Sequence, residues 1–259
     1  MINGYFKLVF TENESYISLF PPADGGAPIQ VDELRDYCVS KGFPNIDIVA
    51  VKKIVDNLSK QENIKIANKK GIPASESFRV IVAPDKMTAS CRFYPPSTGG
   101  AELTVTDIKS TLKLQGVTRG VDDKAIEAYL ANRQYCTDLV MAKGEPPKQG
   151  EDASIEYFFN TNPNLKPKLN EDGSVDFHTL SAISLVNAGD KLAQLTREVP
   201  GEPGFNVTGD ILQPREVKKL QLKFGRNIEL SEDELTITSL VNGHASLVEE
   251  KVFVSDVYQ

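Results

Sequence analysis

The beginning of the chain shows two kinds of hydrophobic pattern in succession. Two short runs rich in aromatic and β-branched residues, 5–10 and 16–20, flank the turn-forming sequence Thr-Glu-Asn-Glu. This arrangement predicts a β-hairpin. Apolar residues then recur at the spacing of a helix face, first within 31–39 and again within 48–58. The pattern therefore predicts the order β-β-α-α.

The same pattern returns further along the chain. The sequence Phe-Pro-Pro-Ala-Asp-Gly-Gly at 20–26 recurs as Tyr-Pro-Pro-Ser-Thr-Gly-Gly at 94–100, and the apolar positions that follow stay in register. Turn residues and apolar positions that match together over such a length indicate an internal repeat. We therefore predict a duplicated β-β-α-α module, with copies at about 4–58 and 78–132.

From about residue 153 onward the helical period disappears, and short β-rich runs alternate with turn signals. This pattern predicts an all-β, barrel-like or solenoidal region. Residues 160–170, rich in Asn, Pro and Lys, are the best linker candidate. We predict an α+β protein with a duplicated domain at 1–165, followed at 166–259 by an all-β barrel-like domain that leads into a β-solenoid. The predicted strands are 154–159, 174–177, 183–186, 191–195, 220–224, 227–230, 234–238 and 251–257.

Composition excludes several classes of protein. The 259 residues include 36 acidic and 29 basic side chains, for a net charge of −7, which disfavours general attraction to nucleic acid. No apolar run approaches the roughly 18 residues that a membrane span requires, and the start has no secretory signal. Cys38, Cys91 and Cys136 are widely separated, which predicts buried reduced thiols. We expect a cytoplasmic protein without nucleic-acid partners or a membrane span.

No motif supplies a catalytic or metal-binding centre. Asn170–Asp176 resembles the middle of a calcium loop, but Lys168 and Thr179 stand where that loop needs carboxylates. His178 and His244 lack metal-ligand spacing, so we interpret both as structural or surface residues. Nucleophile-elbow, phosphate-loop and dinucleotide motifs are absent from the sequence. We therefore predict no catalytic, cofactor-binding or metal-binding residues and no cofactor.

One segment is similar to the turn of biotinyl and lipoyl domains. Val186–Ala193 has their order of valine, Gly-Asp and Leu-Ala. Those domains carry a modified lysine at a hairpin tip, whereas the Asp-Lys-Ala sequence at 123–125 lies here in a predicted helix. We interpret the segment as the same hairpin geometry without the cofactor.

An ordered series of short motifs runs through the second half of the chain. The motifs are Gly-Glu-Pro-Pro at 144–147, Gly-Glu-Asp at 150–152, Ile-Glu-Tyr-Phe-Phe at 155–159, Asp-Gly-Ser-Val-Asp at 172–176, Val-x-x-Gly-Asp-x-Leu-Ala at 186–193, Pro-Gly-x-Pro-Gly-x-x-Val-x-Gly-x-Ile at 200–211 and Gly-x-Asn-Ile-x-Leu-Ser-x-Asp at 225–233. Each motif alone is weak, but their order resembles the bacterial flagellar assembly protein A family. The amino-terminal repeat is consistent with the domain that precedes these motifs in that family.

The resemblance implies both a fold and a role. Members of the family carry this region before a right-handed β-solenoid and often a coiled-coil tail; they are cytoplasmic, with no established enzymatic activity, and some are linked to flagellar assembly or polar localisation. The resemblance therefore implies a non-enzymatic scaffold or interaction module with protein partners. The alternative is a small-ligand-binding protein or a hydrolase with a site in the interdomain cleft.

The end of the chain carries a further expectation. Gln259 stands where the solenoid of the family would begin, so we expect a truncated or short form. The apolar run 251–258 then predicts an edge strand without its next coil. Such an edge either folds back onto the chain itself or pairs with a second copy as a weak homodimer.

Overall fold

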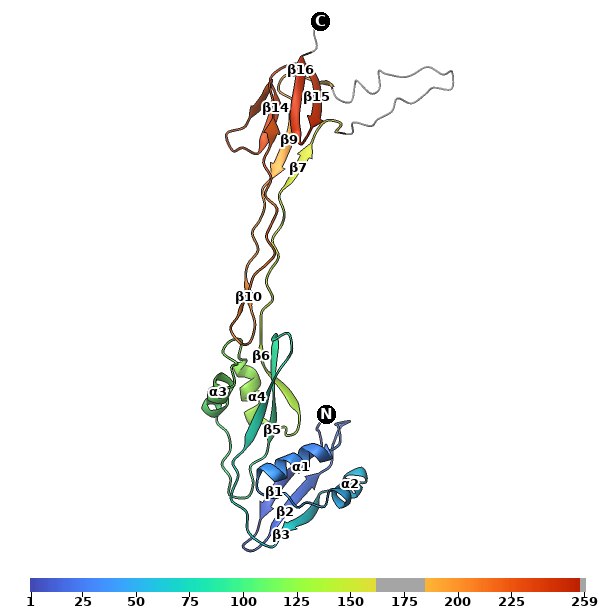
Figure 1. The fold of residues 1–259 in the computed structure, drawn as a ribbon, viewed down its shortest axis with the longest axis vertical. Coiled ribbons are helices and arrows are strands. Elements are labelled where there is room, and N and C mark those ends of the chain that lie inside the picture. Colours follow the sequence, from blue (N-terminus) through green and yellow to red (C-terminus); the bar gives the residue numbers. More distant parts are fainter. Residues whose placement is uncertain (162–184, 257–259) are drawn as a thin grey trace, which may run out of the picture. The chain divides into compact units, whose positions relative to one another are not determined.

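The structure is a computed structural model that describes residues 1–161 and 185–256 (Figure 1). It divides into two compact units: unit 1 is Met1–Pro146 with Gly204–Leu212, and unit 2 is Pro147–Pro203 with Gln213–Gln259. The mixed α+β class is confirmed, because the described residues form four helices and mainly antiparallel strands. The predicted domain boundary between 165 and 166 lies outside the described residues and stays a prediction.

Unit 1 contains the element order β-β-α-α-β twice, which we call repeat 1 (residues 1–67) and repeat 2 (residues 74–143). The predicted β-β-α-α order is visible in both, and each repeat adds a third strand that the sequence pattern did not predict. Each sheet is antiparallel, in the orders β1-β2-β3 and β4-β5-β6. The elements are β1 (Tyr5–Phe10), β2 (Ser15–Phe20), α1 (Val31–Ser40), α2 (Ile48–Asp56), β3 (Glu62–Ala67), β4 (Ser77–Val82), β5 (Thr88–Tyr94), α3 (Val105–Leu114), α4 (Asp123–Ala131) and β6 (Asp138–Lys143).

The helices begin where side chains satisfy their first backbone N–H groups. The Asp47 carboxylate accepts the Ala50 N–H at 3.0 Å to start α2, and Asp122 accepts the Ala125 N–H at 3.1 Å to start α4. Thr104 and Asp107 form a reciprocal capping box at the start of α3. These caps fix where each helix meets its sheet.

Each repeat has its own hydrophobic core between its helices and one face of its sheet. In repeat 1 the core joins Phe6 and Leu8 of β1 to Leu34 of α1 and Val51 of α2. Repeat 2 has an equivalent core, whose buried members are Ala89, Cys91, Phe93, Ile108, Leu112, Val117, Ile126, Tyr129, Met141, Ala142 and Val207. Val207 comes from far along the chain, so repeat 2 needs a later segment to complete its core.

The Pro-Pro…Gly-Gly match of the sequence corresponds to one backbone contact made twice. A Cβ atom on Gly26 would lie 1.9 Å from the Ile2 carbonyl oxygen, and one on Gly100 would lie 2.0 Å from that of Ala74. The preceding glycine, Gly25 or Gly99, has a φ of +76° in both repeats. A residue with a side chain cannot make this approach, which explains why both copies carry Gly-Gly.

Unit 2 contains two four-stranded sheets that share one hydrophobic core, with buried residues from both sheets such as Leu192, Ile237 and Val252. The described residues form no closed barrel, so the barrel-like form predicted for this region is wrong. The sheets are β13-β14-β9-β7 and β12-β16-β15-β8, built from β7 (Ser154–Tyr157), β8 (Leu185–Val186), β9 (Lys191–Thr196), β12 (Lys223–Phe224), β13 (Ile228–Leu230), β14 (Thr236–Ser239), β15 (Gly243–Val248) and β16 (Lys251–Asp256).

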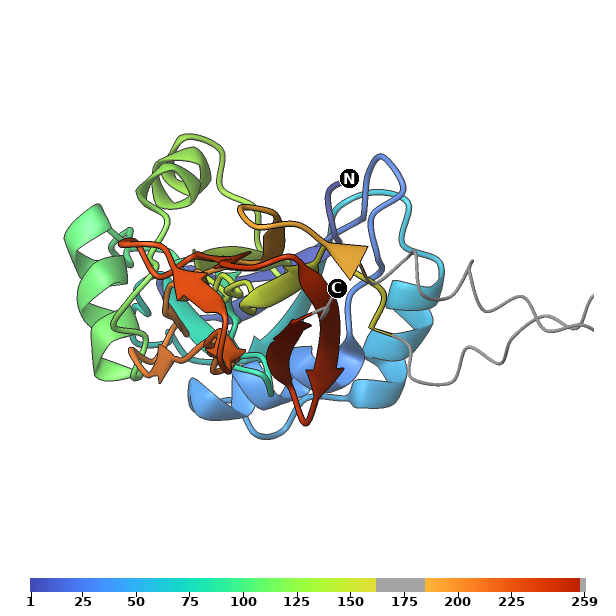
Figure 2. The same cartoon turned by 90° about the horizontal axis from the view of Figure 1, so that it is seen from above.

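Two strand assignments differ from the sequence expectations. Val186–Ala193 is not a hairpin, because β8 pairs with β15 while β9 pairs with β7 and β14, so the tight turn carries the chain from one sheet to the other. β16 is an outer edge only in part, because β15, its hairpin partner in Figure 2, pairs along its whole length whereas β12 pairs with it at Lys251 and Val252. At Lys251 and Val252 it therefore has a neighbour on both sides, and the homodimer through this strand stays a prediction.

We expect the paired glycines to tolerate substitution very unequally. Gly26→Ala and Gly100→Ala each force a Cβ into a carbonyl oxygen, and should lower the free energy of unfolding by about 3 kcal/mol or more. Gly25→Ala and Gly99→Ala meet no close atom and should cost only about 1–2 kcal/mol for the left-handed backbone. Urea unfolding of the four variants measures this, and equal losses in all four would contradict the shared backbone contact.

Candidate functional site

A cross-repeat ion-pair network joins α1 of repeat 1 to β5 of repeat 2. The Glu33 carboxylate accepts hydrogen bonds from Arg92 Nη2 at 2.8 Å, from Arg92 Nε, and from the Tyr94 hydroxyl at 2.6 Å. Arg92 Nη1 also donates to Asp138 Oδ1 at 3.1 Å on β6. The side chains of Glu33 and Arg92 are only 12% and 13% exposed, so the network is largely shielded from water.

The electrostatics of this network hold Glu33 in its ionised form. Burial of the carboxyl group opposes ionisation, but the hydrogen bonds from Arg92 and Tyr94 outweigh it and lower the pKa of Glu33. A carboxyl with a lowered pKa is a poor general acid at neutral pH, because it carries no proton to donate. The arrangement therefore suits the joining of two repeats better than proton transfer.

A cleft of about 250 Å³ lies beside this network, between α1 and the amino-terminal part of β4. Its lining combines the cations Lys41 and Arg79 with aromatic side chains, and the Lys41 ammonium lies 5.5 Å from the centre of the Tyr37 ring. The volume is below the roughly 300 Å³ at which small-molecule pockets begin. An open cleft of this size suits a side chain or a chain segment of a partner better than an enclosed substrate.

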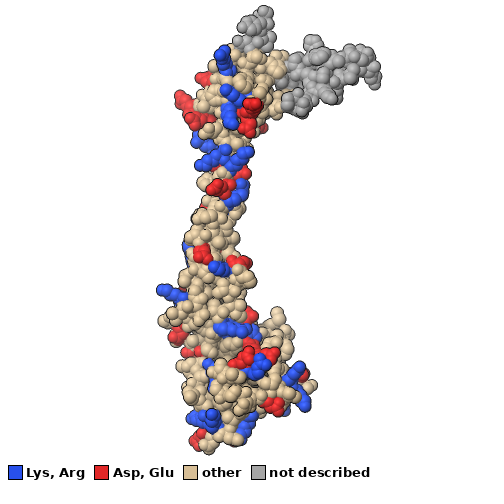
Figure 3. Space-filling view, viewed as in Figure 1, with Lys and Arg blue, Asp and Glu red and all other residues tan. Residues whose placement is uncertain are grey.

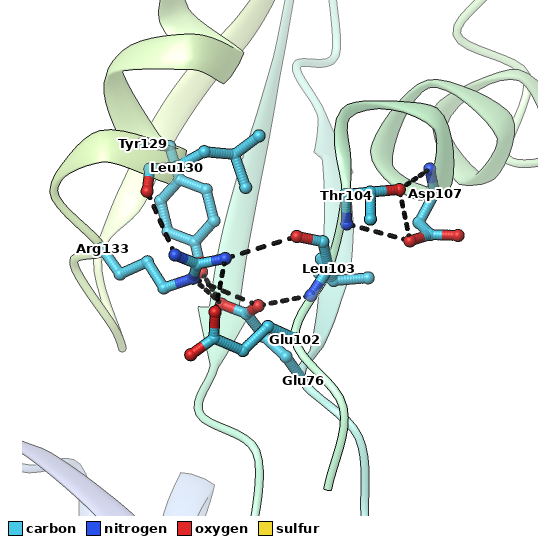
Figure 4. Close-up of polar contacts among 8 residues, drawn as sticks. All are labelled: Glu76, Glu102, Leu103, Thr104, Asp107, Tyr129, Leu130 and Arg133. Carbon is cyan, nitrogen blue, oxygen red and sulfur yellow. Dashed lines mark hydrogen bonds and ion pairs between the residues drawn. The ribbon is translucent and has the colours of Figure 1, made fainter.

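A second polar cluster, in repeat 2, surrounds the fully buried side chain of Glu76 (Figure 4). Its carboxylate accepts hydrogen bonds from the Tyr129 hydroxyl, from Arg133 Nε at 3.2 Å and from the Leu103 N–H at 2.7 Å. Arg133 also donates to the carbonyl oxygens of Leu130 and Leu103 and pairs with Glu102 at 3.2 Å. These bonds tie α4 to the segment that leads into α3.

This cluster is specific to repeat 2. Gly4 is the counterpart of Glu76 in repeat 1, since their N–H groups donate to the carbonyl oxygens of the equivalent residues Ala27 and Ala101. Sequence reasoning missed Glu76, because an acidic residue just before a strand resembles an ordinary solvent-exposed turn residue. The only available signal was a difference between the repeats, since repeat 2 has an acidic residue where repeat 1 has a glycine.

The segment 204–212 from the last part of the motif series folds into unit 1, where β10 (Gly204–Phe205) pairs with β11 (Ile211–Leu212). We call it the signature hairpin. Val207 is fully buried in the core of repeat 2; its N–H donates to the Lys86 carbonyl oxygen at 2.9 Å, and its own carbonyl accepts the Thr118 N–H at 3.0 Å. The hairpin therefore closes the core of repeat 2.

Polar groups hold the tip of the signature hairpin in shape. The buried Asn206 side-chain oxygen accepts N–H bonds from Thr208 at 3.1 Å and Asp210 at 2.9 Å. The Arg119 guanidinium lies 4.0 Å from the centre of the Phe205 ring, an ordinary cation–π distance. The motif at 200–211 is thus explained by packing and turn geometry rather than by chemistry.

Comparison with known families agrees with this geometry. A family model described as the flagellar assembly protein A N-terminal region matches residues 78–250, which is more than half of the chain. The chain belongs to the flagellar assembly protein A family. The resemblance inferred from the motifs is therefore confirmed, and the match contains the signature hairpin and repeat 2 from Phe78 onward. Neither the curated proteins nor the solved structures include a significant match.

The other candidate residues of this family member fall into two groups. His178 and the calcium-like loop from Lys168 to Thr179 lie outside the described residues. His244 is exposed on β15, where the sequence predicted a turn. Within residues 1–161 and 185–256, no three His, Cys, Asp or Glu side chains gather as metal ligands. In those same ranges, no helix combines the length and apolarity that crossing a membrane requires.

All three cysteines are free and buried, as the sequence predicted. Cys38 and Cys91 are inaccessible and Cys136 is 2% exposed. Burial raises the pKa of each thiol to about 12. Because the thiolate is the reactive form, these groups are unsuited to act as nucleophiles in the folded protein.

We expect the thiols to react slowly in the folded chain. At pH 8 a pKa near 12 leaves about a thousandfold less thiolate than an ordinary cysteine has, so labelling should be slowed at least that much. A thiol reagent added with and without denaturant provides the comparison. Rapid labelling of two or more cysteines without denaturant would contradict the buried state.

The cross-repeat network should make stability depend on pH. The lowered pKa of Glu33 means that its contribution is fully present above the unfolded value of about 4.3 and is lost as the pH falls through the folded value. Glu33→Gln should therefore reduce the unfolding free energy by about 2 kcal/mol at pH 7, with the difference shrinking below pH 4. Urea titrations at several pH values measure it.

The control for this variant is Glu127→Gln, which changes an exposed carboxylate on α4. It should leave stability within about 0.5 kcal/mol of the parent at every pH. A Glu33→Gln difference that persists unchanged in acid would show that the network acts through packing and not through ionisation.

Proposed function

We propose that this member of the flagellar assembly protein A family is a non-enzymatic cytoplasmic scaffold that holds protein partners during flagellar assembly. The observation that carries the proposal is the family match over residues 78–250. The family is not a known family of enzymes. The flagellar context comes from the family, and the scaffold role is our inference from the sites.

The polar sites of unit 1 support a scaffold. Glu33 is held ionised by Arg92 and Tyr94, and Glu76 is covered by Tyr129 and Arg133, so both buried carboxylates are engaged in joining elements. A general acid or base must instead be free to exchange a proton with a substrate. Engaged, shielded carboxylates favour a binding role over hydrolysis.

The distribution of charge supports protein partners rather than nucleic acid. Figure 3 shows basic and acidic side chains interspersed over the visible face, without a broad basic stripe. Nucleic-acid-binding surfaces usually concentrate Lys and Arg on one face or in one groove. Mixed charge of this kind suits polar contacts with another protein.

The parallel pairing of β12 with β16 supports the further proposal that unit 2 leads into a β-solenoid. Lys223 and Phe224 pair in register with Lys251 and Val252. Parallel pairing of strands that follow one another around a coil is the pattern of a solenoid. The other strand pairs of unit 2 are antiparallel, so this pair would be the point of entry.

Genetic removal in the native host tests the scaffold proposal. We expect deletion to lower the number of flagella per cell counted by electron microscopy, and a plasmid copy to restore it. Arg79→Glu, which reverses an exposed charge at the α1–β4 cleft, should restore flagella less well than Lys113→Glu on α3. Normal flagella and motility in the deletion strain would refute the proposal.

A further inference from the structure

Within unit 1, a turn of repeat 2 covers the outer edge of β1 in repeat 1. The Thr98 N–H donates to the Leu8 carbonyl oxygen at 3.2 Å, and Thr98 Oγ1 accepts the Phe10 N–H at 3.1 Å. Phe6, Leu8 and Phe10 are all buried beneath this contact. In the turn of repeat 2 that makes this contact, Pro95, Pro96 and Ser97 are buried as well. The contact therefore covers the edge of β1 and leaves only the tip of the turn, at Thr98 and Gly99, exposed.

The same edge exists in repeat 2 without a cover. Tyr5 pairs with Phe20 in repeat 1 as Ser77 pairs with Tyr94 in repeat 2, so Phe78, Val80 and Val82 of β4 correspond to Phe6, Leu8 and Phe10. In the part of the chain that the structure describes, no backbone group pairs with the outer side of β4 along these three residues. They are also only half-buried, unlike their counterparts.

The same turn exists in repeat 1 without an edge to cover. Pro21–Gly26 corresponds to Pro95–Gly100, and both make the close glycine approach to the preceding strand. Asp24 stands at the position of Thr98, and Ala23 is exposed whereas its counterpart Ser97 is buried. Gly25 and Gly99 share a φ of +76°, but Asp24 has a φ of +53° whereas Thr98 has no positive φ, so Asp24 must leave the left-handed region to present its N–H as Thr98 does. Each chain therefore presents a free edge that corresponds to that of β1 and a free turn that corresponds to Pro95–Gly100 in sequence and in its glycine approach.

The β4 edge has little protection against strand or turn addition. Its sequence, Ser-Phe-Arg-Val-Ile-Val, carries one charge in six residues and holds three consecutive β-branched residues. β3, an outer strand of the other sheet, carries Glu62 and Lys65 and pairs through a bulge at Ser15 and Tyr16. Charges and bulges are the usual protection of an edge, so β3 is guarded and β4 is not.

We propose that the outer edge of β4 binds the Pro21–Gly26 turn of a second copy of this chain, as β1 binds the Pro95–Gly100 turn within one chain. The Asp24 N–H donates to the Val80 carbonyl oxygen, and its carboxylate accepts the Val82 N–H. We infer this binding partner from the contact within one chain, in which the corresponding turn of repeat 2 covers the corresponding edge of β1. Because edge and turn are different surfaces, the contact is heterologous and joins copies head to tail.

The contact between copies is weaker than the contact within the chain. The ion pair of Glu33 with Arg92 corresponds to Asp107 and Ser18, which form no ion pair. The backbone bonds, the turn and the half-buried apolar face of β4 remain. Association is therefore reversible and depends on concentration, which suits a scaffold that assembles only where it accumulates.

Two complementary variants test the proposal on the intact chain. Val82→Pro removes the outward N–H of the edge, and Asp24→Lys removes the carboxylate of the turn at an exposed position. Sedimentation from micromolar to millimolar concentration should show that the parent grows beyond a dimer. Each variant alone should stay monomeric, with association about tenfold weaker or more. Glu12→Lys, in the exposed hairpin turn of repeat 1, is the matched control and should associate like the parent.

Mixing the variants gives the decisive result. Val82→Pro keeps its turn and Asp24→Lys keeps its edge, so an equimolar mixture should form a dimer that grows no further. This dimer also shows that both variants are folded. If the parent protein stays monomeric over this concentration range, the proposal is wrong. That result would be expected if the β4 edge binds a different protein. Association that survives both variants overturns it too and indicates pairing elsewhere, such as through β16.

Discussion

The hydrogen-bonding needs of strand edges organise unit 1. A three-stranded sheet has two outer strands whose backbone groups need a partner or protection. In repeat 1 the edge of β1 is covered by Thr98, and in repeat 2 the edge of β6 is covered by the segment before α4, where the Asp122 N–H donates to the Met141 carbonyl oxygen at 2.8 Å. The packing of repeat 2 against repeat 1 follows from the first of these contacts.

The two repeats have diverged at the positions that this packing made unequal. Glu33, on the side of repeat 1 that meets repeat 2, gained Arg92 and Tyr94 as partners, whereas its counterpart Asp107 serves only as a helix cap. Glu76 stands where repeat 1 has Gly4, and its hydrogen bonds with Tyr129 and Arg133 hold α4 in place. A shared ancestry thus left two similar sheets with different polar contacts, and neither set leaves a free reactive group.

Local patterns predicted much of the fold. The Pro-Pro…Gly-Gly turn required a backbone approach that only glycine allows, and the helices were predicted from apolar spacing. The third strand of each repeat was missed, because β3 and β6 pair with strands that precede both helices and no hairpin turn marks that pairing in the sequence. The features that were predicted correctly all depend on residues close together in the sequence.

Contacts between distant residues could not be predicted in this way. Glu33 and Arg92 are 59 residues apart, and nothing local marks either as a partner. The turn at Gly189 has the sequence of a hairpin, but the strands on either side find partners in different sheets. β16 was expected at an edge because no further coil follows it, but β12, well before it in the sequence, pairs with its first two residues. These features depend on which distant segments pair with one another, and a single sequence does not show that pairing.

The motifs that identify the family therefore report on backbone proximity rather than on chemistry. In unit 2 a Cβ on Gly150 would lie 2.3 Å from the Val199 carbonyl oxygen, and one on Gly201 would lie 2.5 Å from that of Lys148. These glycines mark where chain segments run too close for side chains, and Val207 marks where a hairpin enters a core. Partner contacts can then use surfaces that the motifs leave free, and the edge of β4 is one surface on which this chain leaves backbone groups without a partner among the described residues.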